Sequence, residues 1–237
     1  MKNYQEDLLQ ISENAFNEHE IFRHIQTAAK ALGWDYCAYG LRLPMPLSNP
    51  KILMLNNYSE AWQKHYHESG YLFSDPTVIH GRKSQKPLIW SEQAFSGARE
   101  LWDDARTYGL KVGWAQSSLD GNGVGGMLSL SRSGEVLTPQ ELAAKESQMR
   151  WLVNFAHLPL SRILVDKTVN QSEILLTPRE LEVLKWTADG KSAQETADIL
   201  NVTKHVIDFH IKNAIVKLKT ANKTAAVVKA AMLGLLN

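Results

Sequence analysis

Three helix-start signals follow one another closely in residues 177–203. The segments "TPRE" at 177–180 and "SAQE" at 192–195 each place a hydroxyl residue three positions before a glutamate, the capping-box pattern that begins a helix. Gly190 supplies a stop between them, and Thr203 starts another helix eleven residues after Ser192. This spacing predicts two short helices joined by a tight turn, preceded by a third helix from Thr177.

The helix that Thr203 begins is predicted to be amphipathic over 204–218. Its apolar positions fall at helical spacing and form a single stripe, at Ile207, Ile211, Ala214, Ile215 and Leu218. The opposite face carries Lys204, His205, Asp208, Lys212 and Lys219. Asn222 caps a final helix over the last residues of the chain. The pattern fits a helix-turn-helix, whose second helix enters the DNA major groove, and it also fits a plain four-helix bundle with a solvated charged face.

The charge of the chain is unevenly distributed. Residues 174–237 contain nine Lys or Arg and six Asp or Glu, a net charge of +3, whereas residues 1–173 contain 17 and 19, a net charge of −2. The basic tail indicates a polyanionic partner, and the larger body is mildly acidic.

The tail resembles the DNA-binding domain of LuxR-type transcription regulators. The segments that carry the likeness are "LTPRELEVLKWTADGKSAQETADIL" at 176–200, "FHIKNAIVKL" at 209–218 and "NKTAAVVKAAMLGLL" at 222–236. This resemblance favours the helix-turn-helix over the plain bundle. Residues expected to contact DNA are the helix starts Ser192 and Thr203, the cations Lys204, Lys212 and Lys217, which neutralise phosphates, and His205, Asp208 and His210.

Asp208 departs from the family pattern. The family usually has a Thr-Val pair followed by Asn or Lys before "FH", and this chain has Val206, Ile207 and Asp208. A carboxylate near phosphates is unfavourable, because it repels the charges that drive binding. Asp208 either pairs with Lys204 or Lys212 at i±4 on the surface or accepts a hydrogen bond from a cytosine amino group.

The body of the chain is predicted to be an α+β domain. Strands are expected at 34–43, 51–57, 87–90, 112–119 and 125–132, and helices at 8–16, 21–32, 59–68, 75–83, 95–109 and 137–164. Helices on both sides of a mainly antiparallel sheet make an α-β-α sandwich. Thr138 and Glu141 predict a capping box for the last of these helices, which Pro159 could bend. The predicted division is a ligand-binding domain at 1–165, a polar linker at 166–173 and an all-α helix-turn-helix domain at 174–237.

Several function classes lack support in the sequence. The single cysteine, Cys37, excludes an internal disulfide framework and fits a reducing cytoplasm. No apolar run approaches the roughly 18 residues of a membrane span, so no membrane association is expected. The eight histidines have no zinc-type spacing, no cofactor is expected, and "DGNGVGG" at 120–126 reads as a hairpin rather than a dinucleotide loop. No nucleophile elbow or phosphate loop predicts an enzyme.

An aromatic stripe lies in the first half of the body. Tyr58, Trp62 and Tyr66 are spaced i, i+4 and i+8, which places three polar-tipped rings on one face of a helix. Asp75 precedes Pro76, as an N-cap precedes a proline at the first helical position. By themselves these residues are also consistent with ordinary core packing and helix capping.

The pattern "NY...W...Y...DP...W" over 57–90 resembles the receptor domain of LuxR-type quorum-sensing regulators, which bind N-acyl-homoserine lactones. The resemblance implies that Trp62 donates to the lactone carbonyl, Asp75 accepts the amide N–H and Tyr58 donates to the amide carbonyl. It also implies that Tyr66 and Trp90 wall the head group. The remaining implied contacts are Thr77 and Ser129 around the acyl carbonyl and Trp102, Ala105 and Leu110 against the ligand.

The two resemblances together predict a ligand-responsive transcription regulator. A lactone would complete the core of the body and favour a homodimer, which places two recognition helices about one DNA turn apart on a near-palindromic site. The alternative is a regulator of the same architecture that senses a different small apolar molecule. The acyl length, the operator and the direction of regulation do not follow from the sequence.

Overall fold

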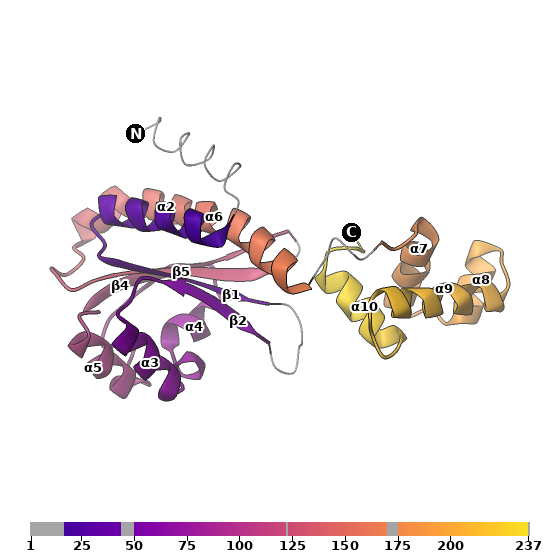
Figure 1. The fold of residues 1–237 in the computed structure, drawn as a ribbon, viewed down its shortest axis with the longest axis horizontal. Coiled ribbons are helices and arrows are strands. Elements are labelled where there is room, and N and C mark those ends of the chain that lie inside the picture. Colours follow the sequence, from indigo (N-terminus) through magenta and orange to yellow (C-terminus); the bar gives the residue numbers. More distant parts are fainter. Residues whose placement is uncertain (1–16, 44–49, 122, 170–174, 237) are drawn as a thin grey trace. The chain divides into compact units, whose positions relative to one another are not determined.

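The computed structural model describes residues 17–43, 50–121, 123–169 and 175–236, so the helix predicted over 8–16 lies outside the described residues. The chain divides into two compact units, and the division falls between Leu164 and Val165. The first unit is an α-β-α sandwich and the second consists of helices, as the sequence predicts (Figure 1). None of the described helices is both long and apolar enough to span a membrane.

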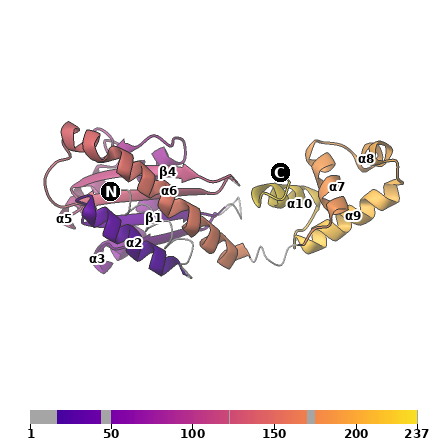
Figure 2. The same ribbon diagram turned by 90° about the horizontal axis from the view of Figure 1, so that it is seen from above.

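The first unit is built on one antiparallel sheet with the strand order β2-β1-β5-β4-β3. The strands are β1 (Tyr36–Arg42), β2 (Ile52–Asn56), β3 (Leu88–Ile89), β4 (Val112–Leu119) and β5 (Gly125–Arg132). Helices α2 (Glu18–Ala31) and α6 (Pro139–Val169) cover one face of the sheet (Figures 1 and 2). The other face carries α3 (Glu60–Glu68), the 3-10 turn η1 (Tyr71–Phe73), α4 (Pro76–Gly81) and α5 (Arg99–Thr107).

The two faces of the sheet differ in side-chain size. Toward α2 and α6, alternate strand positions present large apolar groups, at Cys37, Tyr39, Leu41, Trp114, Leu128 and Leu130, all buried. The hydroxyl of Tyr39 hydrogen-bonds His157 Nδ1 on α6 at 2.9 Å, which confirms the direction of this face. Toward α3, α4 and α5, the central strands present mainly small residues, at Ala38, Gly40, Gly113, Ala115, Ser129 and Ser131, with the larger Tyr36 and Met127 among them. Small side chains leave volume between the sheet and the helices of that face, which bulkier residues would fill.

Helix α6 is longer than the sequence predicts. It continues through Pro159 and ends at Val169, so its last residues lie in the segment expected to be a linker. Residues 170–173 of the expected linker lie outside the described part of the chain. At the start of α6 the Thr138 hydroxyl accepts from the backbone N–H of Glu141 at 3.1 Å, as a cap should.

The Glu141 carboxylate does not serve mainly as half of a capping box. It accepts two parallel hydrogen bonds from Arg132 on β5, at 2.8 and 2.7 Å, and one from Lys145 at 2.8 Å. The Arg132 guanidinium also lies over the Trp34 ring, 5.2 Å from its centroid. These bonds lower the pKa of Glu141 from 4.5 to about 2. The carboxylate therefore fastens α6 to the end of β5.

The second unit follows the predicted caps closely. Its helices are α7 (Pro178–Ala188), α8 (Ala193–Leu200), α9 (Lys204–Lys217) and α10 (Lys223–Met232). Both capping boxes, Thr177–Glu180 and Ser192–Glu195, are formed in full, and Asn222 caps α10. Asn201 ends α8 in the left-handed conformation, with φ 52°, which creates the tight turn into α9. Thr203 occupies the N-cap of α9, but its side chain makes no capping hydrogen bond within the described structure.

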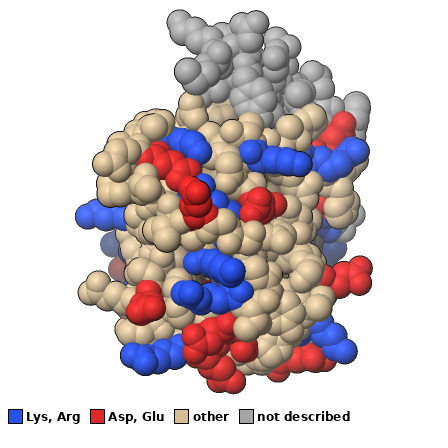
Figure 3. Space-filling view, turned by 90° about the vertical axis from the view of Figure 1, so that its left-hand side faces the viewer, with Lys and Arg blue, Asp and Glu red and all other residues tan. Residues whose placement is uncertain are grey.

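The apolar stripe of α9 packs inward as predicted. Ile207 joins Val183 and Ala197 in one buried cluster, while Ala214 and Leu218 join Leu184 and α10 in another. The exposed face holds the five polar residues expected there, Lys204, His205, Asp208, Lys212 and Lys219. On the face of the first unit that Figure 3 shows, by contrast, acidic and basic side chains are interspersed.

We expect the Glu141 contact to make the stability of the sheet domain depend on acid pH. Because its pKa is lower in the folded than in the unfolded chain, the contact stabilises fully above pH 4.5 and is lost as the pH falls toward 2. Glu141→Gln should cost about 1–3 kcal/mol of unfolding free energy at pH 7 and much less near pH 2. Urea unfolding followed by tryptophan fluorescence measures this, since six of the seven tryptophans precede residue 174.

Glu146→Gln is the matched control, because Glu146 pairs on the same helix with Arg150 at a more exposed position. Equal losses for the two variants at pH 7 would contradict the assigned role of Glu141.

Candidate functional site

The candidate ligand site is an aromatic cluster between α3, α5 and the small-residue face of the sheet. Trp62 on α3 is 4% exposed and packs with Trp102, Ala105 and Leu110, the residues predicted to close the site. Tyr58, Tyr66 and Trp90 pack against the same cluster. The structure thus brings together seven of the ten predicted ligand residues in one cluster.

Local sequence explains the position of Trp62. The Ser59 hydroxyl caps α3 by accepting from the Trp62 backbone N–H at 3.3 Å. Helical spacing then stacks the Tyr66 ring against Trp62 in a T-shaped contact, with centroids 5.7 Å apart. Tyr108, just after α5, approaches Trp62 from the other side at 5.2 Å. Rings at these distances and angles fix one another by packing and by their quadrupoles.

Asp75 connects α3 to α4. Its Oδ1 accepts from the backbone N–H of Thr77 at 2.7 Å, so it is the N-cap that the sequence predicts, with Pro76 at the first helical position. Its Oδ2 accepts from the Tyr66 hydroxyl at 2.8 Å. Burial raises the pKa of Asp75, and the bonds from Tyr66 and Thr77 oppose that rise. Each oxygen therefore holds one partner within the protein, and each keeps a further lone pair.

Trp90 lies directly on the sheet. It follows β3, and its backbone N–H donates to the Gly113 carbonyl at 2.8 Å. The indole ring occupies the space that a Cβ at Gly113 would take, so only glycine allows this approach. Phe95 connects the Trp90 ring to Trp102, with centroid distances of 5.8 and 4.9 Å. Trp90, which was expected to wall the head group, is therefore connected by ring packing to Trp102, one of the residues expected to close the site.

The Trp90 indole N–H at this site is buried and has no hydrogen-bond partner among the described residues. The buried Thr77 and Ser131 hydroxyls form no well-aligned bond among those residues, although Thr77 lies near the Asp75 carboxylate and Ser131 near the Tyr58 hydroxyl. Ser131 is 0% exposed, pairs with Gly113 across the strands and lies beside the Tyr58 hydroxyl, whose pKa is raised by burial. Leaving such groups unpaired costs about 1–3 kcal/mol each. The arrangement suits a bound molecule that offers hydrogen-bonding atoms inside apolar walls.

Ser131 was missed by the sequence analysis, which named Ser129 on the same strand. Ser129 is buried between Ala38 and Ala115 on the small-residue face. Residues two apart on a strand point to the same side, so the "SLS" repeat could have indicated Ser131 as well.

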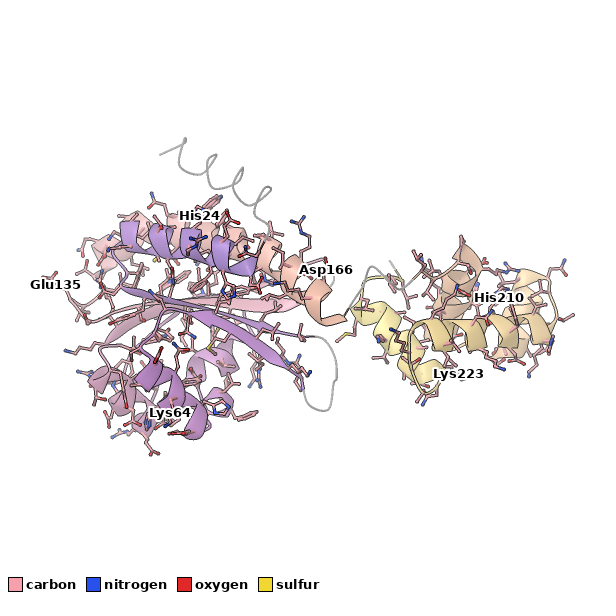
Figure 4. The ribbon with its side chains drawn as sticks, viewed as in Figure 1. His24, Lys64, Glu135, Asp166, His210 and Lys223 are labelled. Atoms are coloured by element: carbon pink, nitrogen blue, oxygen red, sulfur yellow. The ribbon has the colours of Figure 1, made fainter. Side chains whose placement is uncertain are left out.

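The candidate nucleic-acid interface is the exposed side of α8 and α9. Lys204, His205, Asp208 and Lys212 are exposed, and His210 is partly buried beside Phe209, 5.5 Å between ring centroids (Figure 4). Phe209 was not predicted, although it is 55% exposed on this helix. Lys204 Nζ lies 3.0 Å from Asp208 Oδ2, which is the surface pair that the sequence offered as one alternative.

Lys217, which was predicted to neutralise a phosphate, also has a partner inside the domain. Its ammonium donates to Glu180 Oε2 at 2.8 Å, and the Glu180 side chain is only 3% exposed. Burial favours the neutral carboxylic acid, but the bonds from Lys217 and from the Thr177 backbone lower the pKa of Glu180 below its ordinary value. Lys217 therefore fixes α9 to α7. Ser192 likewise has an internal partner, because its N–H and hydroxyl form the capping box with Glu195.

Comparison with known families accounts for both units. An autoinducer binding domain matches residues 17–160, and the luxR family of bacterial regulatory proteins matches residues 175–230. The chain belongs to the LuxR family of transcription regulators.

Relatives of this LuxR-family chain match it from end to end. Transcriptional activator protein AnoR of Acinetobacter nosocomialis is 45% identical over all of both chains. Regulatory protein SdiA of Escherichia coli K12 is 35% identical over 92% of this chain and 90% of its own. A crystal structure of E. coli SdiA superposes with a TM-score of 0.87 at 32% identity, covering 99% and 98% of the two chains. These relatives are regulators of transcription rather than enzymes, and the LuxR-family fold agrees with the architecture described above.

We expect the contact between Trp90 and Gly113 to tolerate no added methyl group. Gly113→Ala forces the indole away from β4 and should cost about 1–3 kcal/mol of unfolding free energy, as overpacking typically does. Gly40→Ala is the control on the same sheet face, because no atom lies within 4 Å of the added methyl. Chemical denaturation of both variants measures the difference, and equal stabilities would contradict the close packing of Trp90.

Proposed function

We propose that this LuxR-family regulator binds an N-acyl-homoserine lactone in the aromatic cluster around Trp62. The supporting observation is the buried Trp90 indole N–H, which has no hydrogen-bond partner among the described residues, together with the buried Thr77 and Ser131 hydroxyls and the Asp75 carboxylate, within walls that are otherwise apolar. A neutral, amphipathic molecule with several acceptors and one amide N–H supplies partners for such groups. The family-implied roles are retained for all ten predicted residues: Tyr58, Trp62, Tyr66, Asp75, Thr77, Trp90, Trp102, Ala105, Leu110 and Ser129.

Asp75 can hold the ligand amide without leaving its place. An ionised carboxylate accepts about four hydrogen bonds, and Tyr66 and Thr77 provide two of them. The Tyr66 hydroxyl then orients the carboxylate instead of competing for the ligand. In this proposal the amide N–H adds a third bond, and Trp62 and Tyr58 donate to the two carbonyls.

A second candidate ligand is a monoacylglycerol, or another small acyl compound with a hydroxylated head group. E. coli SdiA has been solved in complex with octanoyl-rac-glycerol, and that structure superposes with a TM-score of 0.86 at 33% identity. Hydroxyls of such a head group could pair with Ser131, Thr77 and Trp90, which the lactone ring uses incompletely. Thermal shift of the full-length protein with a panel of lactones and acylglycerols separates the two candidates. No stabilisation by any acyl-homoserine lactone would contradict the proposed ligand.

We further propose that the protein acts in the cytoplasm as a homodimer on a near-palindromic DNA site. The net charge of +3 on residues 174–237 and the exposed cations of α9 support DNA contact. Two copies of a helix-turn-helix read two half-sites about one turn apart. Sedimentation of the protein with and without lactone tests the dimer, and footprinting on promoter DNA tests the half-site spacing.

We predict that Trp62→Phe weakens binding of N-octanoyl-homoserine lactone on the order of tenfold. An aromatic ring remains at this position, but the indole N–H that would serve the lactone carbonyl is removed together with the five-membered ring. Calorimetric titration of the full-length protein measures the change. N-octanoyl-cyclopentylamide lacks that carbonyl, so its affinity should fall only by the loss of ring packing, which is smaller than the loss for the lactone. Trp151→Phe on α6 is the matched control, and equal losses for both ligands would contradict the assigned bond.

We predict that Asp208→Ala strengthens DNA binding uniformly. The variant removes a negative charge and releases Lys204 from its 3.0 Å pair. The slope of log affinity against log salt should then become more negative by about one. Asp198→Ala on α8, also exposed and acidic, is the control for a change in charge alone. A loss of preference at one G·C pair in binding-site selection would instead show that Asp208 reads cytosine.

A further inference from the structure

Asp104 on α5 joins three elements that surround the aromatic cluster. Its Oδ2 accepts from His65 Nε2 on α3 and from the Tyr71 hydroxyl on η1, both at 2.5 Å. The acceptor is a carboxylate, so Nε2 of His65 carries the proton and donates. One oxygen atom thus connects α3, η1 and α5, which are separated in sequence by up to 39 residues.

The two donors to Asp104 are themselves packed against Trp62. His65 lies one turn after Trp62 on the helix, with ring centroids 6.1 Å apart, and Tyr71 approaches the indole at 6.4 Å. Tyr108 stacks on His65 at 5.8 Å and also contacts Trp62. Tyr71 packs in addition against Tyr66, the residue that orients Asp75. Movement of Asp104 would therefore displace Trp62 and, through Tyr66, Asp75.

Both bonds to Asp104 involve an ionised acceptor. The bonds from His65 and Tyr71 lower the pKa of Asp104, and burial together with the bond to Asp104 raises the pKa of Tyr71 to about 12. At neutral pH the carboxylate is charged and the phenol keeps its proton. Bonds of this kind are shorter and roughly twice as strong as neutral ones.

Asp104 is not among the residues proposed to contact the ligand. Its neighbours Trp102 and Ala105 point into the cluster and are buried, whereas the Asp104 side chain is partly exposed on the outer side of α5. Asp103, next to it, is exposed. The contacts of Asp104 hold the elements that carry the ligand-facing rings.

We infer that Asp104 is a positioning residue for ligand recognition, which sets the separation of α3 and α5 around Trp62 through His65 and Tyr71. This inference rests on the proposed function, since it assigns the geometry of the same site. It predicts that Asp104 controls affinity for the ligand, although it does not touch the ligand. When Asp104 is replaced, the binding enthalpy should become less favourable together with the affinity, because the rings that meet the head group are no longer held in place.

The test compares Asp104→Leu, Asp104→Asn and the matched control Asp103→Leu in the full-length protein, with N-octanoyl-homoserine lactone as the probe. Calorimetric titration well below the melting temperature measures affinity, and thermal unfolding without ligand measures stability separately. Asp104→Leu should weaken binding on the order of tenfold or more, because both charge-assisted bonds are lost. Asp104→Asn keeps an acceptor oxygen and should recover part of that loss, and Asp103→Leu should bind as the wild type does.

A double-mutant cycle with Tyr71→Phe completes the test. If Asp104 acts through Tyr71, Asp104→Leu should weaken binding less in the Tyr71→Phe background than in the wild type. A lowered melting temperature with unchanged affinity in Asp104→Leu would show a purely structural role and overturn the inference. Absence of lactone binding by the wild-type protein would contradict the proposed function itself, whereas wild-type binding with equal variant affinities contradicts only the role of Asp104.

Discussion

Within each of the two units, carboxylates that bind partners from several elements fasten those elements to one another. A buried carboxylate is unfavourable unless its oxygens are hydrogen-bonded, so each one requires its partners to stay in place. Glu141 joins α6 to β5, Asp75 joins α3 to α4, and Glu180 joins α7 to α9. Asp104 does the same for α3, η1 and α5. These bonds add direction to the apolar packing between the elements, which is less directional by itself.

This use of charge also changes how the basic tail should be understood. Lys217 and Lys204 each have an acidic partner within the second unit, and Arg179 pairs with Glu182 at 2.6 Å. At least three of the nine basic side chains in residues 174–237 are therefore partly neutralised inside the domain. Counterion release depends on the cations that reach phosphates rather than on the number in the sequence. A single domain then has modest electrostatic affinity, which agrees with the proposal that two copies act together.

The sequence predicted most of the fold, because its signals were local. The caps at Thr177, Ser192 and Asn222 and the alternation of the strands depend on neighbouring residues, and the structure has them. The bond from Tyr66 to Asp75 and the role of Lys217 were not predictable, since the partners meet only after the chain has folded.

The length of α6 and the place of Ser131 in the candidate site were missed for related reasons. Polar residues after Leu164 resemble a linker until the helix that precedes them is seen to continue. Ser131 becomes distinctive only when Gly113 and Trp90 are seen beside it. The family-implied ligand roles, the dimer and the palindromic site remain predictions.

The small side chains on one face of the sheet have a consequence for how signal preference could diverge among such receptors. Ala38, Gly40 and Ala115 stand on the central strands, whereas the polar groups proposed to hold the head group come mainly from helices and loops on the other side. In the proposed binding mode, a substitution that adds one or two carbons on this platform would shorten the space for an acyl tail and leave the head-group contacts unchanged. Tail length and head-group chemistry can thus evolve at separate positions, and neither requires a change in the helices that read DNA.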